Sequence, residues 1–359
     1  MYKTTKVSII IPVYNSKKFI DECVKSLVNQ TLKEIELIFV NDGSTDNTVE
    51  ILKNYQKSDP RIIVVSQENK GISMARNTGL GIAKGDYIGF CDHDDYINSN
   101  MLEILFNIAV NKDVDIVVSK TILGRDNKEI IKKTVFPPNV IYDKKFIQEK
   151  IIPNLLEKED LFPVWNKIYR RSLIEKNEIK FPANRDIEED NMFNLYAFNK
   201  CDKAYFADYG GYHFREMEVS ESRKYIEKDY FKYALEKYNF DYKGICDLQM
   251  ESNQIENLKA IRFMRRIFYL TFVCAIEKGK NIKERYQYIS KMVFNIQSLA
   301  ISKKYYLELY NKSGIFEKLI LIIMQKKSKK GLYILVNFVA IVYKPWLSEV
   351  LRFFNGKSK

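Results

Sequence analysis

The sequence predicts an α/β fold, a Rossmann-like, doubly wound parallel sheet followed by a mainly helical C-terminal region. Up to about residue 119, apolar β-branched runs alternate with segments of helical periodicity through short connections. After about residue 222 the chain is rich in Tyr, Lys and Ile, with few helix breakers. With 359 residues, 46% of them apolar, it can form two domains, expected at 1–222 and 223–359.

Five strands are expected in the first third of the chain. Each is an apolar run that ends in polar residues. The first, KVSIIIPVYN, has enough Val and Ile to be buried on both faces of a sheet. The expected strands cover residues 6–15, 34–44, 61–67, 87–92 and 115–119.

Four helices are expected between these strands. Residues 19–29 repeat apolar side chains at a helical period. A second helix follows the second strand, with Ser44 or Thr45 as its N-cap and acids in its first turn. The third covers the glycine-bounded stretch 71–85, and the fourth covers 99–111. Strand and helix therefore alternate as in a doubly wound sheet.

The pattern is weaker after the fifth strand. Residues 120–142 predict a hairpin or an excursion from the sheet, whereas 186–199 predict a helix with an acidic N-terminus. No internal repeat or low-complexity tract is evident. The region after 225 is expected to be helical to the end of the chain.

The positive charge lies mainly at the C-terminal end. The formal net charge is +12, and the last 59 residues hold twelve Lys or Arg against three Glu, which is +9. A basic tail favours an anionic partner such as a membrane or a nucleic acid. The five cysteines are scattered without zinc spacing, and no signal peptide pattern opens the chain, so we expect a reducing cytoplasm.

Three aspartates follow the fourth strand in YIGFCDHDDYINSN, namely Asp92, Asp94 and Asp95. Like charges at this spacing repel, and a bound divalent cation would explain them. The alternative is a solvated acidic loop, with Asn98 or Ser99 capping the next helix. In a parallel sheet, the loops after the strands gather at one edge, where ligands bind. Those loops are 12–15, 41–45, 67–71 and 92–95.

Six motifs, in this order, resemble the family 2 inverting glycosyltransferases of the GT-A fold over about residues 5–215. They are VSIIIPVYN, QTLKEIELIFVNDGSTDNT, ENKGISMARNTGL, GDYIGFCDHDDYI, WNKIYRR and EEDNMFN. The resemblance implies a nucleotide-binding half followed by an acceptor-binding half. It also implies transfer of a sugar from a nucleotide diphosphate donor to an acceptor hydroxyl, with inversion at the anomeric carbon.

The resemblance implies a donor site with Mn²⁺ or Mg²⁺. Asp94 matches the direct metal ligand of the family's DXD motif, Asp92 the metal or ribose contact, and Asp95 a supporting residue. Asp42 matches a residue that binds the donor base, although Asp42 and Gly43 would form an Asp-Gly turn in any case, and both can be true. The remaining matches to the nucleotide pocket are Pro12, Val13, Tyr14 for base stacking or packing, Asn69 for the base or ribose, and Arg76 for phosphate, for Asp92 or for a surface ion pair.

The acceptor side is expected to contain the general base. Glu188, Glu189 and Asp190 match the family's acidic pair, with Asp190 as the base and Glu189 as the fallback. Acids at a helix N-terminus are the alternative. Trp165 could stack on a sugar or pack in the core, and Asp95 and Arg215 are expected on the acceptor side. His213 could be a third metal ligand, a phosphate donor or a structural residue. The remaining cations, which could bind phosphate or cap helices, are Lys167, Arg170 and Arg171.

The sequence therefore predicts a metal-dependent inverting glycosyltransferase that uses a UDP-sugar and modifies a bacterial surface glycan or its lipid-linked precursor. The alternative is a catalytically inactive nucleotide-sugar-binding protein. A dehydrogenase would show GxGxxG after the first strand, where this chain has PVYNSKK. Nucleic acid is not expected as a partner, because the basic residues lie far from the motifs.

The C-terminal region is expected to bind an anionic membrane surface or to form an oligomer interface. Its longest run without charge, residues 331–343, has 13 residues, fewer than the roughly 20 that a membrane-spanning helix needs. Four lysines at 326, 327, 329 and 330, with Trp346 nearby, are typical of a segment lying on anionic lipid. This predicts a cytoplasmic enzyme that is peripheral on the inner face of the plasma membrane.

Overall fold

The computed structural model describes residues 4–125, 128–158, 160–183, 189–215, 225–242, 248, 250–277 and 279–342. The chain forms two compact units. The first comprises Met1–Met217 with Lys243–Gln249, and the second comprises Glu218–Tyr242 with Met250–Lys359. The boundary expected near residue 222 lies outside the described residues and stays a prediction.

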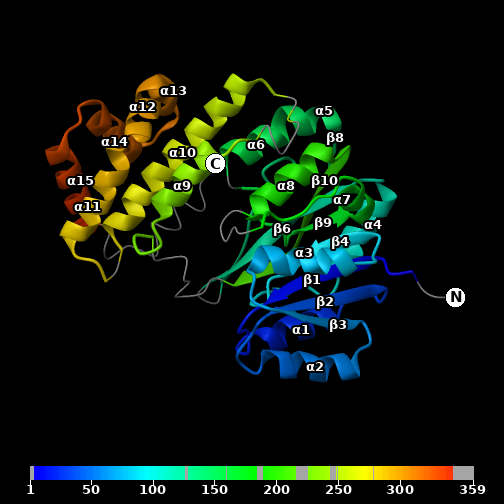
Figure 1. Ribbon diagram of the computed structural model, residues 1–359. Coiled ribbons are helices and arrows are strands. Elements are labelled where there is room, and N and C mark those ends of the chain that lie inside the picture. Colours follow the sequence, from blue (N-terminus) through cyan, green and yellow to red (C-terminus); the bar gives the residue numbers. More distant parts are fainter. Residues whose placement is uncertain are drawn as a thin grey trace. The chain divides into compact units, whose positions relative to one another are not determined.

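The first unit alternates strands and helices along its N-terminal part, as the apolar pattern predicts (Figure 1). The strands are β1 (Val7–Val13), β2 (Ile35–Asp42), β3 (Ile62–Gln67), β4 (Tyr87–Phe90), β5 (Tyr96–Ile97), β6 (Ile116–Arg125), β7 (Lys128–Ile131), β8 (Ile141–Asp143), β9 (Lys167–Arg170) and β10 (Lys203–Arg215). The helices are α1 (Ile20–Val28), α2 (Thr48–Ser58), α3 (Ile72–Ile82), α4 (Met101–Asn111), α5 (Lys144–Phe146), the π-helical turn η1 (Ile147–Ile151), α6 (Ile152–Glu157), α7 (Arg171–Lys176) and α8 (Glu189–Lys200).

The described strands form one mixed sheet in the order β3-β2-β1-β4-β9-β6-β10-β5, with β7 beside β6 and β8 beside β10. Strands β3, β2, β1 and β4 are parallel, as predicted. The sheet also contains β9, which was not expected and runs antiparallel to both β4 and β6, so the sheet is mixed although the five expected strands run in one direction. Apolar periodicity identifies a strand but carries no information on its direction, and β9 separates the fourth and fifth expected strands.

Residues 120–142 contain a hairpin, one of the two alternatives that the sequence left open. β6 continues to Arg125 and pairs antiparallel with β7. Helix α2 begins at Thr48 with Asn47 as its N-cap residue, so the expected cap at Ser44 or Thr45 is wrong. The side chains of Ser44 and Thr45 instead contact Asn15 in the loop after β1. A competing tertiary contact therefore delays the start of this helix.

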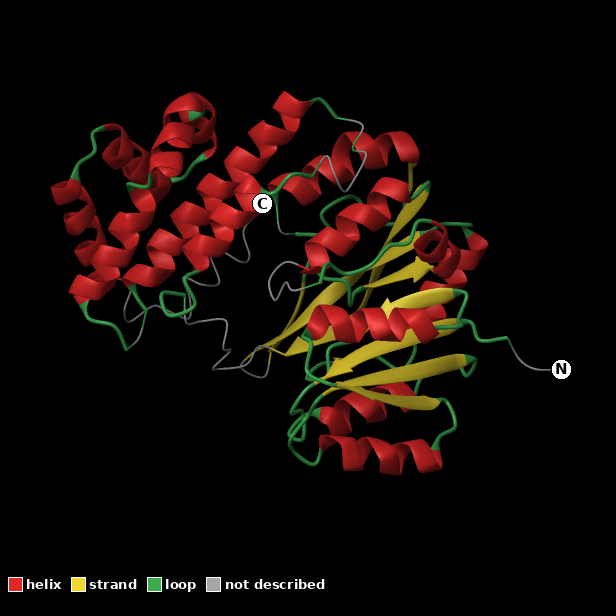
Figure 2. Ribbon diagram, in the orientation of Figure 1, coloured by secondary structure: helices red, strands yellow, loops and turns green. Residues whose placement is uncertain are grey.

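The core of the first unit lies around the sheet, and helices lie on both sides of the strands (Figure 2). Every residue of β1 and β2 is buried, as expected for strands covered on both faces. Helix α3 contacts β1 and β2 closely. A Cβ atom added to Gly79 would lie 2.4 Å from Cγ2 of Ile10, so only glycine allows this approach. The close packing brings Arg76, one turn earlier, to the strand ends.

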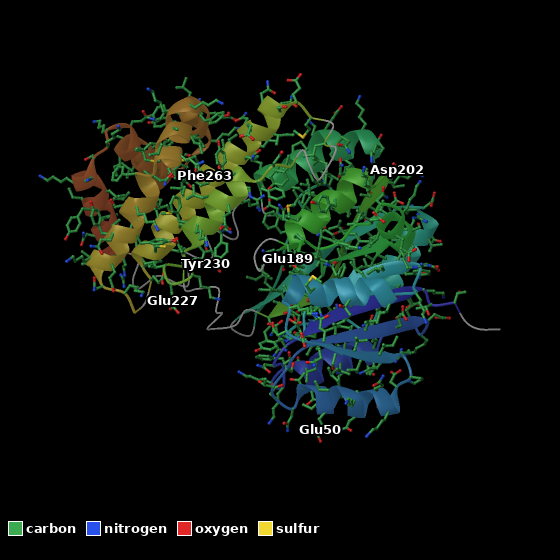
Figure 3. All side chains as sticks on the ribbon, viewed as in Figure 1. Glu50, Glu189, Asp202, Glu227, Tyr230 and Phe263 are labelled. Atoms are coloured by element: carbon green, nitrogen blue, oxygen red, sulfur yellow. The ribbon has the colours of Figure 1, made fainter. Side chains whose placement is uncertain are left out.

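The second unit is helical in its described residues. Its helices are α9 (Tyr230–Asn239), α10 (Ser252–Ala275), α11 (Ile282–Val293), α12 (Ile296–Lys304), α13 (Tyr306–Lys312), α14 (Ile315–Gln325) and α15 (Lys329–Val342). The long helix α10 supplies much of this core, including Phe263, which Figure 3 labels. Within the described part of the chain, none of the helices has the length and apolar character needed to cross a bilayer.

Candidate active site at the strand ends

Hydrogen bonds of Asn15 join the loops after β1 and β2, and a bond of Asn41 closes the second loop on itself. Oδ1 of Asn15 accepts from the backbone amide of Thr45 at 2.8 Å, and the backbone amide of Asn15 donates to Oγ of Ser44 at 3.0 Å. Oδ1 of Asn41 accepts from the amide of Ser44 at 3.0 Å. Asn15 has a φ of 48°, a left-handed conformation that Asn tolerates better than most residues. These contacts hold the two loops side by side.

Asp42 organises the loop between β3 and α3. Its Oδ1 accepts from Nε2 of Gln67 and the amide of Lys70, and its Oδ2 accepts from the amide of Gly71, all at 2.8 Å. Asp42 is only 4% exposed. The structure thus gives Asp42 a loop-building role that the sequence did not reveal, and its role in binding the donor base stays a prediction.

Two of the predicted nucleotide-pocket residues are exposed at these loops. Tyr14, directly after β1, is 47% exposed, whereas Pro12 and Val13 are buried in the strand. Asn69 is also exposed, and it lies against Gly43, where an added Cβ atom would be 2.9 Å from its amide nitrogen. Gly43 has a φ of 74°, so a side chain there would be strained as well. Tyr14 and Asn69 therefore have the accessibility that contact with a base or ribose requires.

Arg76 on α3 connects the acidic loop after β4 with the acids at the start of α8. Its Nη2 lies 3.1 Å from Oδ1 of Asp92, while Nη1 lies 3.0 Å from Oε1 of Glu189 and 2.5 Å from Oδ1 of Asp190. The side chain is 2% exposed. Burial lowers the pKa of Arg76, but Asp190, Asp92 and Glu189 outweigh this effect and raise it overall. One buried guanidinium therefore neutralises charge from two segments far apart in the sequence.

The pKa of Asp190 is raised to about 7. Burial is the largest cause and raises the pKa, Arg76 opposes it, and Glu189 adds to it. Oδ2 of Asp190 accepts from the amide of Val164 at 3.2 Å. Figure 3 shows Glu189 at the beginning of α8, near α3. A carboxylate with a pKa near neutrality can accept a proton at neutral pH, as a general base must. Glu188, the third acid of the predicted group, lies outside the described residues.

Tyr212 on β10 holds the acidic loop, and the sequence analysis missed it. The amide of Asp92 donates to the Tyr212 hydroxyl at 3.0 Å, and this hydroxyl donates to Oδ2 of Asp95 at 2.8 Å. Oδ1 of Asp95 accepts from the amide of Arg215 at 2.8 Å. Tyr212 and Phe214 lie two positions apart on one strand and therefore on the same face. This pair of aromatic residues was the available signal in the sequence.

Asp95 supports the acidic loop. It is 2% exposed, and both of its oxygens accept hydrogen bonds from β10. Burial, followed by the charge of Asp92, raises its pKa to about 8. Its burial and hydrogen bonds favour the supporting role over contact with the acceptor sugar, and that contact stays a prediction. The supporting role that the family pattern implied agrees with these contacts.

The acidic loop fits a hard divalent cation. Within the described residues, the Asp94 carboxylate has no ion pair or hydrogen bond with another side chain, and burial followed by Asp92 raises its pKa despite His93. Carboxylates of this kind can hold Mg²⁺ or Mn²⁺ together with donor phosphates. Over the described ranges, however, no three Asp, Glu, His or Cys residues are grouped to hold a metal. Asp94, together with Asp92, could therefore supply one or two carboxylate ligands to the cation, and a bound donor would complete its coordination.

His213 has protein partners in this structure, and its role as a third metal ligand stays a prediction. Its Nε2 is 2.7 Å from Oδ1 of Asn98, its Nδ1 is 3.3 Å from Oε1 of Glu129, and its ring stacks on Tyr96 at 4.4 Å. Side chains alternate between the faces of a strand, and the adjacent Tyr212 already points to the Asp92 loop. The His213 side chain is therefore expected on the other face, and its contacts favour the structural alternative.

The motif around Trp165 builds the support of the site. The Trp165 ring stacks on Tyr212 at 4.2 Å and is 8% exposed, which favours the core-packing alternative over contact with a sugar. Nζ of Lys167 is buried and contacts the carbonyl oxygens of Leu161, at 3.2 Å, and Pro163. Burial lowers its pKa to about 7, although Asp190 opposes the shift. Lys167 thereby shapes the loop whose Val164 amide binds Asp190.

The other three cations of the predicted set have acidic partners. Arg170 pairs with Asp113 and Asp115, and Arg171 pairs with Glu175. These two arginines are therefore structural and not phosphate ligands. Nη2 of Arg215 lies 2.5 Å from Oε2 of Glu22. Its guanidinium lies 5.2 Å from the ring of Phe19 and 5.7 Å from that of Tyr96. Its predicted contact with the acceptor or diphosphate remains a prediction.

Comparison with known proteins agrees with this geometry. The family described as "Glycosyl transferase family 2" matches residues 8–177. The glycosyltransferase YibD of Escherichia coli is 30% identical over 308 residues, which cover 81% of this chain and 85% of YibD. The chain belongs to glycosyl transferase family 2. This glycosyltransferase is also 39% identical over 213 residues to EpsJ of Bacillus subtilis, over 58% of its own length and 61% of EpsJ.

The fold of this glycosyltransferase is also found in a solved structure. The crystal structure of S. aureus TarS 1-349 in complex with UDP-GlcNAc has a TM-score of 0.61 and 22% identity, over 92% of this chain and 90% of that one. The expected GT-A fold with a C-terminal helical region is thereby confirmed. At this identity the likeness concerns the fold, and the residues of the site are argued from their own contacts.

Proposed function

We propose that this glycosyltransferase transfers a sugar from a UDP-sugar to an acceptor hydroxyl of a bacterial surface glycan, inverts the anomeric carbon and depends on a divalent metal. The observation that carries the proposal is the contact of Arg76 with both Asp92 and Asp190. Asp92, the candidate metal or ribose contact, and Asp190, the candidate base, bind different nitrogen atoms of this one guanidinium. A displacement reaction with inversion needs its leaving group and its base on opposite sides of the reacting carbon.

In this mechanism Asp190 accepts the proton of the acceptor hydroxyl at its carboxylate. Its pKa of about 7 leaves a large fraction ionised at neutral pH. Arg76 orients the Asp190 carboxylate through Oδ1, and the Val164 amide orients it through Oδ2. Glu189, which shares the same Nη1 atom of Arg76, remains the fallback base.

The donor is proposed to bind over the loops after β1 to β4. Tyr14 and Asn69 are accessible for the base and ribose, and Asp94, with Asp92, would hold Mn²⁺ or Mg²⁺. When bound, this cation supplies charge stabilisation for the departing diphosphate. TarS, which has a similar fold, was crystallised with UDP-GlcNAc, so UDP-sugars are the first donors to test.

Thermal-shift measurements test the donor proposal. The full chain is heated with UDP-, GDP- or dTDP-sugars, each with MnCl₂ or EDTA. We expect at least one UDP-sugar to raise the melting temperature with manganese and to have a smaller effect with EDTA. Stabilisation only by another nucleotide overturns the UDP assignment. Equal stabilisation with EDTA overturns the metal assignment.

The second candidate is a nucleotide-sugar-binding protein without catalytic activity. The observation that favours it is that both oxygens of Asp190 already have partners, Arg76 and the Val164 amide. A carboxylate held in this way can still accept a proton, because each oxygen has a second lone pair. Donor hydrolysis separates the candidates. Metal-dependent donor binding without hydrolysis or transfer favours the binding protein.

The partners and location follow the same proposal. We place the reaction in the cytoplasm at the inner face of the plasma membrane, where a lipid-linked acceptor would be accessible. Two bacterial relatives named as poly(ribitol-phosphate) glycosyltransferases, one from Bacillus spizizenii and TarP from Staphylococcus aureus, motivate a bacterial surface glycan as the acceptor class. The C-terminal unit is proposed to contact an anionic membrane, with self-association as the alternative. Nucleic acid is not proposed as a partner.

A further inference from the structure

Helix α15 has an apolar face on the side opposite to its packed face. Its buried residues, Leu332, Leu335, Val336 and Val339, follow a helical period and belong to the core of the second unit. Neighbours in this packing are α10, α11 and α14, as Figure 1 shows for the red end of the chain. A surface helix normally has polar residues on its other face. Here the exposed residues are Tyr333, Ile334, Phe338, Ile341 and Val342, with exposed fractions from 42% to 74%.

A lysine cluster precedes this apolar face. Lys326, Lys327, Lys329 and Lys330 are all exposed. The sequence has no Asp or Glu from residue 318 to residue 342. Among the residues that the structure describes, none of the four lysines forms an ion pair. The positive charge of the cluster is therefore available to an external anionic partner.

The face is preformed and does not need helix α15 to detach. The ring of Tyr333 contacts that of Tyr286 on α11 edge-on, with centroids 5.3 Å apart. The Tyr286 hydroxyl donates to the carbonyl oxygen of Lys329 at 3.3 Å. These contacts fix the first turn of α15 on α11. The apolar side chains farther along, Ile334, Phe338 and Ile341, are thus presented by a helix that already packs on its unit.

We propose that the apolar face of α15 and the lysine cluster form a docking surface for an anionic phospholipid bilayer, with the helix lying in the plane of the interface. A helix of 14 residues is too short to span a bilayer, which needs about 20, but apolar residues beside lysines are typical of interfacial helices. A symmetric contact between two copies through this face would bury the apolar side chains but would offer the lysines no acidic residue of residues 318–342. An anionic surface instead complements both the apolar side chains and the lysines.

Co-flotation of the full chain with vesicles tests this surface. Vesicles of phosphatidylcholine alone are compared with vesicles in which phosphatidylglycerol makes up two fifths of the lipid. We expect the wild type to float with the anionic vesicles at least about tenfold more than with the neutral ones, and less in high salt. The variant Phe338→Glu/Ile341→Glu is expected to lose about tenfold in binding to anionic vesicles.

Matched controls separate this surface from general stickiness. Ile296→Glu/Leu307→Glu changes two apolar residues on α12 and α13 that are at least as exposed as Phe338 and Ile341, and this variant should bind like the wild type. A second comparison sets a variant with the four cluster lysines changed to Gln against one with four exposed lysines of the first unit changed to Gln. The first-unit lysines are Lys53, Lys57, Lys132 and Lys133. Only the cluster variant should lose the preference for anionic vesicles.

Three results would overturn the proposal. One is equal flotation with neutral and anionic vesicles. Another is equal loss in the α15 variant and its control. The third is a wild-type dimer without lipid that Phe338→Glu/Ile341→Glu converts to a monomer, since this would assign the face to a second copy. Because flotation does not depend on glycosyl transfer, failure of the proposed function leaves this result interpretable.

Discussion

One cluster of charged residues in each unit can be compared, and the two clusters differ in burial and in pairing. At the strand ends of the first unit, three carboxylates surround Arg76, whose side chain is 2% exposed. In the turn between α14 and α15 and at the start of α15, four exposed lysines have no acidic partner among the described residues. A buried charge must be paired, because desolvation costs several kcal/mol per ion, whereas an exposed charge is solvated by water. The pairing of Arg76 with the three carboxylates therefore fixes the geometry of the site, whereas the charge of the lysine cluster remains available to an external partner.

This comparison teaches where a substitution should have specific effects. Changes at the buried site should affect folding and chemistry together, because Arg76 contributes to both. Changes at the exposed lysines should affect only association with other molecules. The four predictions below concern the buried side of the comparison, from the largest expected effect to the smallest, and the vesicle experiment above concerns the exposed side.

Asp94→Asn is expected to reduce sugar transfer by about 10³-fold, because it removes a charge that would hold the cation at the diphosphate. It should also weaken donor binding in manganese but not in EDTA. The rate of transfer and the donor Kd measure this. Asp86→Asn, an exposed acid in the same unit, is the control and should behave like the wild type. Wild-type activity of Asp94→Asn would refute its assignment as metal ligand.

Arg76→Met is expected to lower the free energy of unfolding by about 3–5 kcal/mol, because it leaves Asp92, Glu189 and Asp190 without their buried partner. Urea unfolding measures the loss. Arg171→Met is the matched control, because its guanidinium pairs with Glu175 at a partly exposed position, and it should cost about 1 kcal/mol or less. If both variants lose the same stability, the buried cluster has no special role.

The pH dependence of transfer should follow Asp190. Its pKa is raised to about 7, and a general base acts only when ionised. The rate is therefore fully present above pH 7 and falls about tenfold for each pH unit below it. Asp190→Asn should lose about 10²–10⁴-fold in rate, keep donor binding and show no such limb in its residual activity. An unchanged limb in Asp190→Asn would assign the base to another residue, with Glu189 next.

Tyr212→Phe is expected to weaken donor binding in manganese by about fivefold, because its hydroxyl joins the Asp92 amide to Asp95 and one hydrogen bond contributes about 1 kcal/mol. Tyr142→Phe is the control, since its buried hydroxyl donates to the carbonyl of Pro137 in another part of the unit. Both variants should lose similar stability. Only Tyr212→Phe should change donor affinity, and equal affinities would show that this hydroxyl does not position the loop.

Local patterns sufficed for β1, β2, β3, β4 and β6 and for helices α1 to α4, whereas β5, β8, β9 and β10 were not expected. β1 and β2 appear as apolar β-branched runs because their burial on both faces leaves no room for polar side chains. The loops at their ends could be grouped in advance, since parallel strands bring their carboxyl ends to one edge. The resemblance then selected Asp92, Asp94 and Asp190 among the many acids of the chain.

Only the tertiary structure decided which of these residues touch. That β9 enters the sheet antiparallel, that Trp165 packs on Tyr212, and that His213 contacts Asn98 depend on contacts between distant segments. The link of Arg76 to Asp190 spans 114 positions. Residue types and periodicity report how each side chain prefers water or the core, whereas its partner depends on packing and on the pairing of buried charge. A sequence read locally contains the first kind of information and not the second.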